Sequence, residues 1–451
     1  MSIILSVLLA LTQVSVEHRA TGAVVDVVPV TAGAPHQTQR NEPGLDTDAG
    51  LAPAAPVKQF TWDLQATFPN VVFIDLSFAD DSVGYACAEL GIAYKTTNSG
   101  ATWTRIMNLG FPYYWYGVSA LSRDRAIVTG FNNTAGTGIY RWTTDGGSTW
   151  DSIVALDTAN WLSRVHFADS LHGIISAGWN GGIWRTDNGG RNPSDWTYVQ
   201  VDPARGWYEG NLCYRADGHC WLTGITFCGS SDNGATWNVQ HSADPTFDGG
   251  VWFSDTLHGW TGGGQISSPV SGWVHRTTDG GKTWSDRLFE PSEPIRAVLF
   301  LNETIGFAVG GNHYSGVGAI YSTIDAGDSW RLDVNTGSEM KGIDFQVVGD
   351  SIDLWCCGFS SSFTGCIYKT RIAATGAGIG EWGIGSGPWG RPASLGPTIL
   401  TEASSLKHLA SGVVFDALGR RVLDPKPGVH LVRAVGRGSS AASCAKVVIA
   451  K

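Results

Sequence analysis

TTDGGSTW, residues 143–150, decides the fold, because close copies of this octapeptide recur along the chain. The tryptophan that ends each copy follows the previous one at spacings of 47, 46, 41, 47 and 46 residues. A period of this length is typical of the four-stranded blades of a β-propeller. The other copies are TTNSGATW (96–103), RTDNGGRNPSDW (185–196, with an insertion), SSDNGATW (230–237), TTDGGKTW (277–284) and TIDAGDSW (323–330).

Each copy has the composition of a tight turn that leads into a strand. The Asp carboxylate can accept backbone N–H bonds, and the Gly two positions later permits a positive φ. The Thr or Ser two positions earlier can add a local side-chain bond, and the Trp packs over the turn. Carboxylates that backbone donors saturate are poor acid/base catalysts. We therefore assign structural roles to Asn98, Asp145, Asp187, Asp232, Asp279 and Asp325.

A second motif, F-x-D/N with a Gly about four residues later, precedes the octapeptides and completes seven units of four strands. The seventh unit ends near Thr370 without a last strand, while Thr61-Trp62 stands alone 41 residues before Trp103. We predict that this N-terminal segment supplies the missing strand. The result is an all-β, seven-bladed propeller over residues 59–371 with no open sheet edge. The second motif starts at Phe78, Phe167, Phe253 and Phe300, with degenerate copies at Leu121, Tyr214 and Phe345.

The octapeptide resembles the Asp-box (BNR) repeat of sialidases, xyloglucanases and sortilin-type receptors. Together with the F-x-D motif, it is most similar to photosystem II assembly-factor-like propellers. The resemblance implies that the Asp boxes lie at the blade periphery, away from the ligand site. The F-R-I-P segment of sialidases is absent, and so is the second propeller of the xyloglucanases. These departures favour a non-catalytic binding or scaffold module, with a glycoside hydrolase as the alternative.

The two ends of the chain indicate export. Residues 3–16 are an apolar run of signal-peptide length, so we expect a signal peptide at 1–20, followed by a linker at 21–58. A Gly-rich linker at 372–397 precedes short β runs at 398–451, a small C-terminal β module. This tail resembles the C-terminal sorting domain of type IX secretion, through Asp416, Gly419-Arg420, Pro427-Gly428 and Lys446–Lys451, although His430 replaces the usual Tyr. The resemblance implies the type IX machinery as a partner and delivery to the surface of a Gram-negative bacterium.

Charge and cysteine content exclude several classes of function. With 40 Asp+Glu against 30 Lys+Arg, the net charge of −10 argues against nucleic-acid binding. No GxSxG, HExxH, P-loop or EF-hand motif occurs, and no CxxC pair, so we predict neither a cofactor nor a metal site. The cysteines allow disulfides between Cys213 and Cys220 or between Cys357 and Cys366, and equally allow buried free thiols.

Propeller ligands bind where the innermost strands begin, and aligned positions there are rich in aromatic residues. Six residues before the F-x-D phenylalanine stand Val72, Trp115, Trp161, Tyr208, Phe247, Pro294 and Glu339. Flat rings with polar neighbours suit sugars or extended peptides; the alternative is that these rings pack between blades. The candidate ligand-binding residues are Trp115, Trp161, Tyr208, Phe247, Arg164, Arg296 and Lys341. Glu209 and Asp248 are weak catalytic candidates, because glycoside hydrolysis needs two suitably spaced carboxylates.

Overall fold

The structure is a computed structural model that describes residues 60–158, 160–178, 181–201, 211–224, 226–241, 249–265, 270–285, 289 and 291–373. It also describes the backbone of five strands between residues 398 and 449. The predicted signal peptide and the linker at 21–58 lie outside the described residues, as does the second linker from residue 374 onward. Residues 372 and 373, which we assigned to that linker, belong instead to the last strand of the propeller.

The secondary structure is almost entirely antiparallel β-sheet, in seven blades. Blade 1 consists of β2 (Phe73–Phe78), β3 (Gly84–Ala88), β4 (Ile92–Thr96) and β5 (Thr104–Asn108), and blade 2 consists of β6 (Tyr113–Ala120), β7 (Ala126–Asn132), β8 (Thr137–Thr143) and β9 (Val154–Asp157). Blade 3 consists of β10 (Leu162–Phe167), β11 (Gly173–Ala177), β12 (Gly182–Thr186) and β13 (Thr197–Gln200), with the 3-10 helix η1 (Pro193–Asp195) before its last strand. Blade 4 consists of β14 (Leu212–Tyr214), β15 (Cys220–Leu222), β16 (Phe227–Ser230) and β17 (Asn238–His241). Blades 5 to 7 consist of β18 (Val251–Phe253), β19 (Gly259–Gln265), β20 (Ser271–Thr277); β21 (Ile295–Phe300), β22 (Gly306–Asn312), β23 (Val317–Thr323), β24 (Arg331–Asn335); and β25 (Glu339–Val348), β26 (Ser351–Phe359), β27 (Gly365–Ala373) with β1 (Asp63–Phe68).

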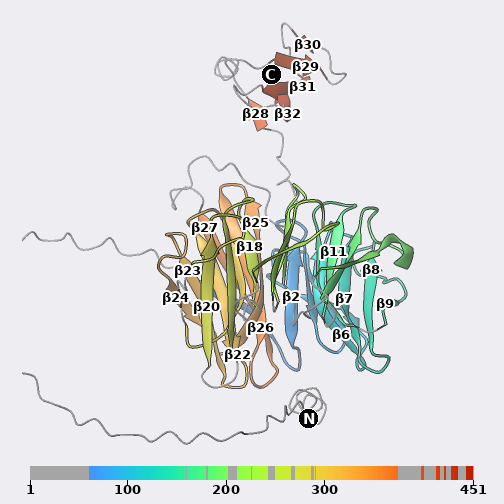
Figure 1. The fold of residues 1–451 in the computed structure, drawn as a ribbon, viewed down its shortest axis with the longest axis vertical. Coiled ribbons are helices and arrows are strands. Elements are labelled where there is room, and N and C mark those ends of the chain that lie inside the picture. Colours follow the sequence, from blue (N-terminus) through green and yellow to red (C-terminus); the bar gives the residue numbers. More distant parts are fainter. Residues whose placement is uncertain are drawn as a thin grey trace, which may run out of the picture. The chain divides into compact units, whose positions relative to one another are not determined.

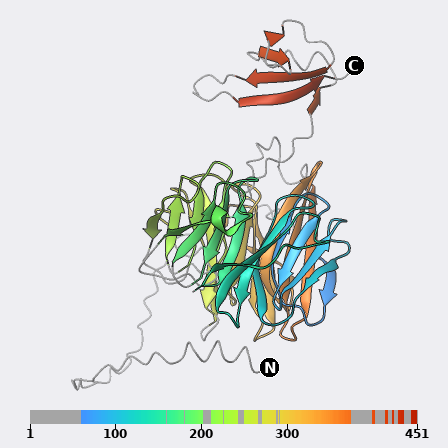
Figure 2. The ribbon, with the colours of Figure 1, turned by 90° about the vertical axis from the view of Figure 1, so that its right-hand side faces the viewer.

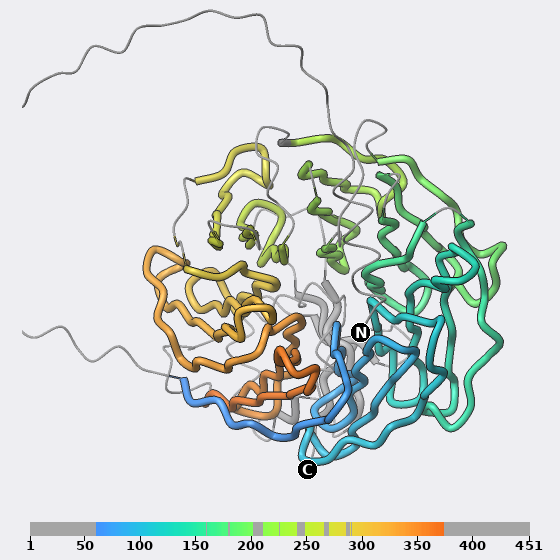
Figure 3. Tube along the Cα trace, turned by 90° about the horizontal axis from the view of Figure 1, so that it is seen from below, coloured from blue at the N-terminus to red at the C-terminus, as the bar shows by residue number. Residues whose placement is uncertain are grey.

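The seven blades form a closed ring, as the repeat period predicts; Figure 3 shows the ring face-on, and Figures 1 and 2 show it from the side. The first strand of each blade contacts the first strand of the next, in the order β2, β6, β10, β14, β18, β21, β25 and back to β2. Because the strands in a blade are antiparallel, the turns after the first and third strands share one end of the ring, which we call the turn end. The innermost strands begin at the opposite end, which we call the mouth.

The N-terminal segment closes the ring, which confirms the prediction. Strand β1 pairs antiparallel with β27, with Asp63 opposite Lys369, and Figure 3 shows this blue segment beside the orange last blade. The rings of Phe60 and Trp62 contact Phe307 of blade 6, with centroids 5.2 and 5.7 Å away. The Trp62 Nε1–H also donates to the Asp333 carboxylate of β24 at 3.4 Å, and burial raises the pKa of Asp333 to about 6.

Blade 5 departs from the four-strand expectation. Its described residues form three strands, and the outer position is a single antiparallel bridge from Val274 to Phe289. The other blades each have four strands.

The octapeptides form the expected turns. In the copy at 143–150, Asp145 accepts the Thr149 N–H at 2.8 Å, and Thr143 Oγ1 accepts the Gly147 N–H at 2.8 Å. Gly147 has φ of +87°, which favours glycine. The Thr149 hydrogen bonds lower the pKa of Asp145 to about 2, so this acid stays ionised and suits no proton transfer near neutral pH. In their own turns, the equivalent side chains accept the same backbone N–H bond from the residue four positions later: Asn98, Asp232, Asp279 and Asp325.

The turn at 185–196 corrects one assignment. Asn188, not Asp187, accepts from Thr186 Oγ1 at 2.9 Å, in the position that Asp145 occupies in its own turn. Asp187 instead forms an ion pair with Arg185. The prediction aligned Asp187 by residue type, whereas the buried Thr at the end of the third strand sets the register of the turn.

Aromatic stacking joins neighbouring blades. Trp260 of blade 5 lies flat on Phe300 of blade 6, with centroids 3.7 Å apart and planes 10° apart, and its Nε1–H donates to the Ala326 carbonyl in the blade 6 octapeptide turn at 2.8 Å. Trp330, which ends that octapeptide, packs edge-on against Phe300 at 5.9 Å. The Phe of the F-x-D motif therefore lies between two Trp rings. The same arrangement occurs at two other interfaces. Between blades 7 and 1, Trp355 stacks on Phe78 and donates to the Ser99 carbonyl, and Trp103 packs edge-on against Phe78. Between blades 4 and 5, Trp221 stacks on Phe253 and donates to the Gly280 carbonyl, and Trp284 packs edge-on against Phe253.

The C-terminal strands form a separate five-stranded sheet in the order β28 (Thr398–Leu400), β32 (Ser443–Ile449), β31 (Gly428–Ala434), β29 (Val413–Asp416) and β30 (Arg421–Val422). Strands β28 and β32 are parallel, and the other pairs are antiparallel. This sheet is the predicted small β module.

The described part of the chain shows neither of the two disulfides that the sequence allowed. Cys213, Cys220, Cys357 and Cys366 are buried free thiols, as are Cys87, Cys228 and Cys356. Among the described residues, no helix has both the length and the apolar character needed to cross a membrane.

The stacked pair can be tested by substitution at Trp260. Trp260→Ala should lower the free energy of unfolding by about 3–5 kcal/mol, because it removes a buried ring and leaves a cavity. Trp260→Phe should cost less, about 1–2 kcal/mol, because it keeps the stacking and loses the N–H donor. Urea unfolding followed by tryptophan fluorescence measures both, with exposed Leu332→Ala as the control. Equal losses in the two variants would assign the stabilisation to the hydrogen bond alone.

Candidate functional site

Irregular strand pairing recurs where the inner strands begin, at the mouth. One residue is left out of the pairing in four of these strands, and the irregularity in β10 spans two. Such a bulge redirects a side chain and leaves backbone groups without a ladder partner. Three cations predicted at the site, Arg164, Arg296 and Lys341, occupy these positions. The residues left out are Ile74, Tyr116, Arg296 and Lys341, with Ser163 and Arg164 in β10.

Two of these cations meet at one buried carboxylate between blades 6 and 7. Glu339, the first residue of β25, has a side chain only 1% exposed. Its Oε1 lies 2.8 Å from Arg296 Nε and 3.1 Å from Lys341 Nζ. Its Oε2 contacts His313 Nδ1 and accepts the His313 backbone N–H at 3.3 Å. We call Glu339, Arg296, Lys341, His313 and the adjacent Tyr314 the blade 6–7 cluster.

A glycine permits the close approach of strands beneath this cluster. Gly358 of β26 pairs with Met340 across the bulge, and a Cβ at Gly358 would lie 2.1 Å from the Glu339 carbonyl oxygen. A larger residue there would displace the start of β25, so Gly358 helps to fix the position of Glu339.

The electrostatics of the cluster keep Glu339 ionised. Burial raises the pKa of Glu339, but Lys341, His313 and Arg296 outweigh that effect and hold the pKa well below its usual range. A carboxyl that stays ionised cannot serve as a general acid near neutral pH. Two permanent cations, Arg296 and Lys341, thus face this one carboxylate.

His313 and Tyr314 were not predicted from the sequence. They lie in the turn between β22 and β23, which is also at the mouth. The His313 ring lies between Tyr314 and Phe359, with centroids 3.9 and 4.9 Å away. Tyr314 is 57% exposed, so it offers a ring face to solvent beside the cations. The turn carries no repeat motif, so the alignment of the blades could not single it out.

Arg164 does not join this cluster. It extends from blade 3 to blade 1, where Nη1 donates to the Ile74 carbonyl at 3.1 Å and lies 3.2 Å from Asp75 Oδ1. It also donates to the Tyr116 carbonyl at 3.2 Å. Ile74 and Tyr116 are themselves bulge residues, so Arg164 satisfies carbonyls that the ladder leaves out. Arg164 is 8% exposed and joins three inner strands, while its role in ligand binding stays a prediction.

The predicted aromatic shelf is corrected in part. Trp115 is 0% exposed and packs in the core between blades 1 and 2, so it presents no ring face to a ligand. Trp161 remains partly exposed at the start of β10, where its ring lies over Gly178 and edge-on to Phe131 at 6.4 Å. Tyr208, Phe247, Glu209 and Asp248 lie outside the described residues.

Proteins of known structure share this fold. YCF48 bound to a D1 peptide superposes with a TM-score of 0.51 at 16% identity, over 70% of this chain and 98% of that one. YCF48 from Cyanidioschyzon merolae gives 0.49 at 16% identity, over 69% and 98%. A GH74 enzyme from Niastella koreensis gives 0.45 at 16% identity, over 64% of this chain and 52% of the enzyme. The chain matches no protein-family model and no curated protein sequence. At these identities the likeness to the first structure supports the propeller fold alone.

The importance of the buried carboxylate can be measured with Glu339→Gln. At pH 7 this variant should lose about 3 kcal/mol of unfolding free energy, because two buried cations lose their counter-charge. The folded pKa of Glu339 is depressed, so its contribution is present above the unfolded pKa of about 4.3 and is lost at lower pH. The difference from the wild type should therefore shrink below about pH 4. Urea unfolding across this range checks it, with exposed Asp63→Asn as the control; a difference that does not change with pH would contradict the ion-pair account.

Proposed function

We propose that this propeller is a non-catalytic binding module that holds an acidic peptide segment of a partner protein at the mouth. The observation that carries the proposal is the blade 6–7 cluster, in which Arg296, Lys341 and His313 surround one carboxylate beside the exposed ring of Tyr314. A carboxylate ligand can pair with these cations while Tyr314 packs against its apolar groups.

One further observation supports a peptide ligand. YCF48, which has a similar fold, has been solved with a bound D1 peptide, so a propeller of this type can present a peptide site. That likeness supports the class of ligand and does not identify it.

A hydrolase would need a carboxyl group protonated near neutral pH and a second carboxylate roughly 5–9 Å away. Glu339 does not meet the first need, since it is ionised and enclosed by cations. The alternative therefore depends on Glu209 and Asp248, which lie outside the described residues.

We also propose that the C-terminal sheet directs delivery to the cell surface through the type IX machinery. The support is that Asp416, Gly428 and Lys446, from the sorting-domain motifs, lie on strands β29, β31 and β32. A chain that lacks residues 398–451 should stay inside the cell, as fractionation and immunoblotting would show. Surface delivery of the shortened chain would contradict this proposal.

The peptide proposal can be tested at Tyr314. The full chain is titrated with a panel of synthetic ten-residue peptides of graded net charge, and fluorescence anisotropy is followed. We expect acidic peptides to bind, with affinity that falls as salt rises. Tyr314→Ala should weaken binding by about tenfold or more, because exposed aromatic anchors contribute strongly to recognition. Tyr198→Ala, on the outer strand β13, is the matched control and should bind like the wild type.

Parallel wells with soluble polysaccharides separate the other outcomes. Polysaccharide binding without peptide binding would replace the peptide by a glycan. Release of reducing sugar would overturn the non-catalytic role and make Glu209 and Asp248 the residues to substitute next.

A further inference from the structure

The turns that follow the innermost strands, at the turn end, have one backbone geometry, so their positions can be compared across blades. The residue after the innermost strand donates its N–H to the carbonyl four positions later: Ala79 to Val83, Leu121 to Arg125, Ala168 to His172, Arg215 to His219, Ser254 to His258 and Leu301 to Ile305. The second residue of the turn in blades 1, 3 and 5 is Asp80, Asp169 and Asp255. The third residue in blades 2, 4 and 6 is Arg123, Asp217 and Glu303.

Blade 5 places an Asp and a His together in this turn. Asp255 Oδ1 accepts the backbone N–H of Leu257 at 2.6 Å and of His258 at 2.8 Å, while Oδ2 lies 2.7 Å from His258 Nδ1. Blade 3 repeats these contacts with Asp169, Leu171 and His172. The Asp–His pair is therefore a turn feature in its own right, and any further role must come from the neighbouring blade.

Two other interfaces pair an acid of these turns with an arginine. Between blades 1 and 2, Asp80 Oδ2 pairs with Arg123 Nε of the next turn at 2.7 Å. Between blades 3 and 4, the residue that corresponds to Arg123 is itself acidic, Asp217, but Arg215 of the same turn pairs with it at 3.2 Å. In both cases an arginine provides the positive charge.

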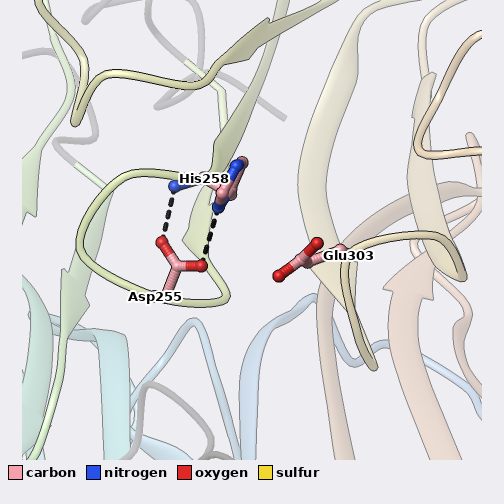
Figure 4. Close-up of side chains that lie close together, drawn as sticks. All are labelled: Asp255, His258 and Glu303. Atoms are coloured by element: carbon pink, nitrogen blue, oxygen red, sulfur yellow. Dashed lines mark hydrogen bonds and ion pairs between the residues drawn. The ribbon is translucent and has the colours of Figure 1, made fainter. Parts of the chain in front are cut away.

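Between blades 5 and 6 the chain supplies a carboxylate and no arginine. Glu303 stands where blade 2 has Arg123, and Leu301 stands where blade 4 has Arg215. Ligand atoms of Asp255, His258 and Glu303 all lie within 4.8 Å of one another, and Figure 4 shows Glu303 directed toward the Asp255–His258 pair. Within the part of the chain that the structure describes, no Lys or Arg forms an ion pair with Asp255 or Glu303.

We propose that a divalent transition-metal cation, such as Zn²⁺, binds between blades 5 and 6 through Asp255, His258 and Glu303. Two carboxylates and one imidazole form an oxygen and nitrogen ligand set that suits Zn²⁺ or Mn²⁺, with water in the remaining positions. Asp255 and His258 have side chains 41% and 36% exposed, so an ion can reach them from solvent. Burial raises the pKa of Asp255, but hydrogen bonds from His258 and Leu257 outweigh it and keep the ligand ionised.

The ion would join blades 5 and 6 at the turn end, whereas the blade 6–7 cluster lies at the mouth, the other end of the ring. The ion would do at the turn end what Arg123 does between blades 1 and 2. The proposed site is structural and independent of the ligand at the mouth. It also differs from the expectation of no metal site, because its residues come from turns of two different blades and form no contiguous motif.

The test uses the full chain, stripped with EDTA and titrated with ZnCl₂ by calorimetry, with thermal unfolding followed in parallel. We expect one equivalent to bind and the unfolding temperature to rise with Zn²⁺ concentration. Glu303→Gln should weaken binding by about tenfold or more, since even residues behind the ligands change metal affinity by 10–100-fold. His172→Gln, in the equivalent blade 3 turn, should leave it unchanged.

Two further measurements separate this site from the buried thiols and from misfolding. Co²⁺ should give d–d absorption without a thiolate charge-transfer band. Glu303→Lys, which provides an ammonium in the turn position of Arg123, should raise the unfolding temperature of the metal-free protein and abolish its response to Zn²⁺. Absence of stoichiometric Zn²⁺ binding to the wild type, or binding to Glu303→Gln and His258→Gln as tight as to the wild type, would overturn the proposal.

Discussion

The stacked indole between neighbouring blades is the contact on which the rest of the structure depends. At three interfaces a Trp of one blade lies flat on the Phe of the next, and its N–H donates to a carbonyl of the next octapeptide turn. Stacking fixes the distance between two sheets, while the hydrogen bond fixes how far one slides along the other. Each turn is itself held by hydrogen bonds of its Asp and Thr. The relative position of two neighbouring blades is therefore fixed at the turn end, and it determines where the inner strands begin at the mouth.

The architecture could be predicted because it depends on repetition. Spacing of the octapeptides gives the blade, the number of units gives the ring, and the isolated Thr61-Trp62 gives its closure, which the pairing of Asp63 with Lys369 confirms. Each of these three inferences uses residue type and count, and none depends on which way a particular side chain points. The error at Asp187 shows the limit, since two adjacent acceptors in one turn cannot be distinguished until the buried Thr186 sets the register.

The candidate site was predictable only in part, because it is built on irregularities. Counting back from the F-x-D phenylalanine placed Trp115 at the mouth. A bulge in β6 lies between Trp115 and the motif, and it changes which face of the strand the residues before it point to. The Trp115 ring is buried. A shift of one residue exchanges the two faces of a strand, so an ungapped alignment cannot give orientation. The alignment placed Arg296, Lys341 and Glu339 at the mouth, but the contacts among them are seen only when blades 6 and 7 lie side by side.

Closure by an N-terminal strand also imposes an order on biosynthesis. Trp62 and its partner Asp333 are 271 residues apart in sequence, and at about 5–20 residues per second a ribosome needs roughly 15–50 s to make the chain between them. For that interval the apolar residues Phe60 and Trp62 lack the blade that buries them, while blades 1 to 5 are being synthesised. The nascent chain therefore carries an unpaired edge for most of its synthesis, and a chaperone that shields this segment would act before the ring exists.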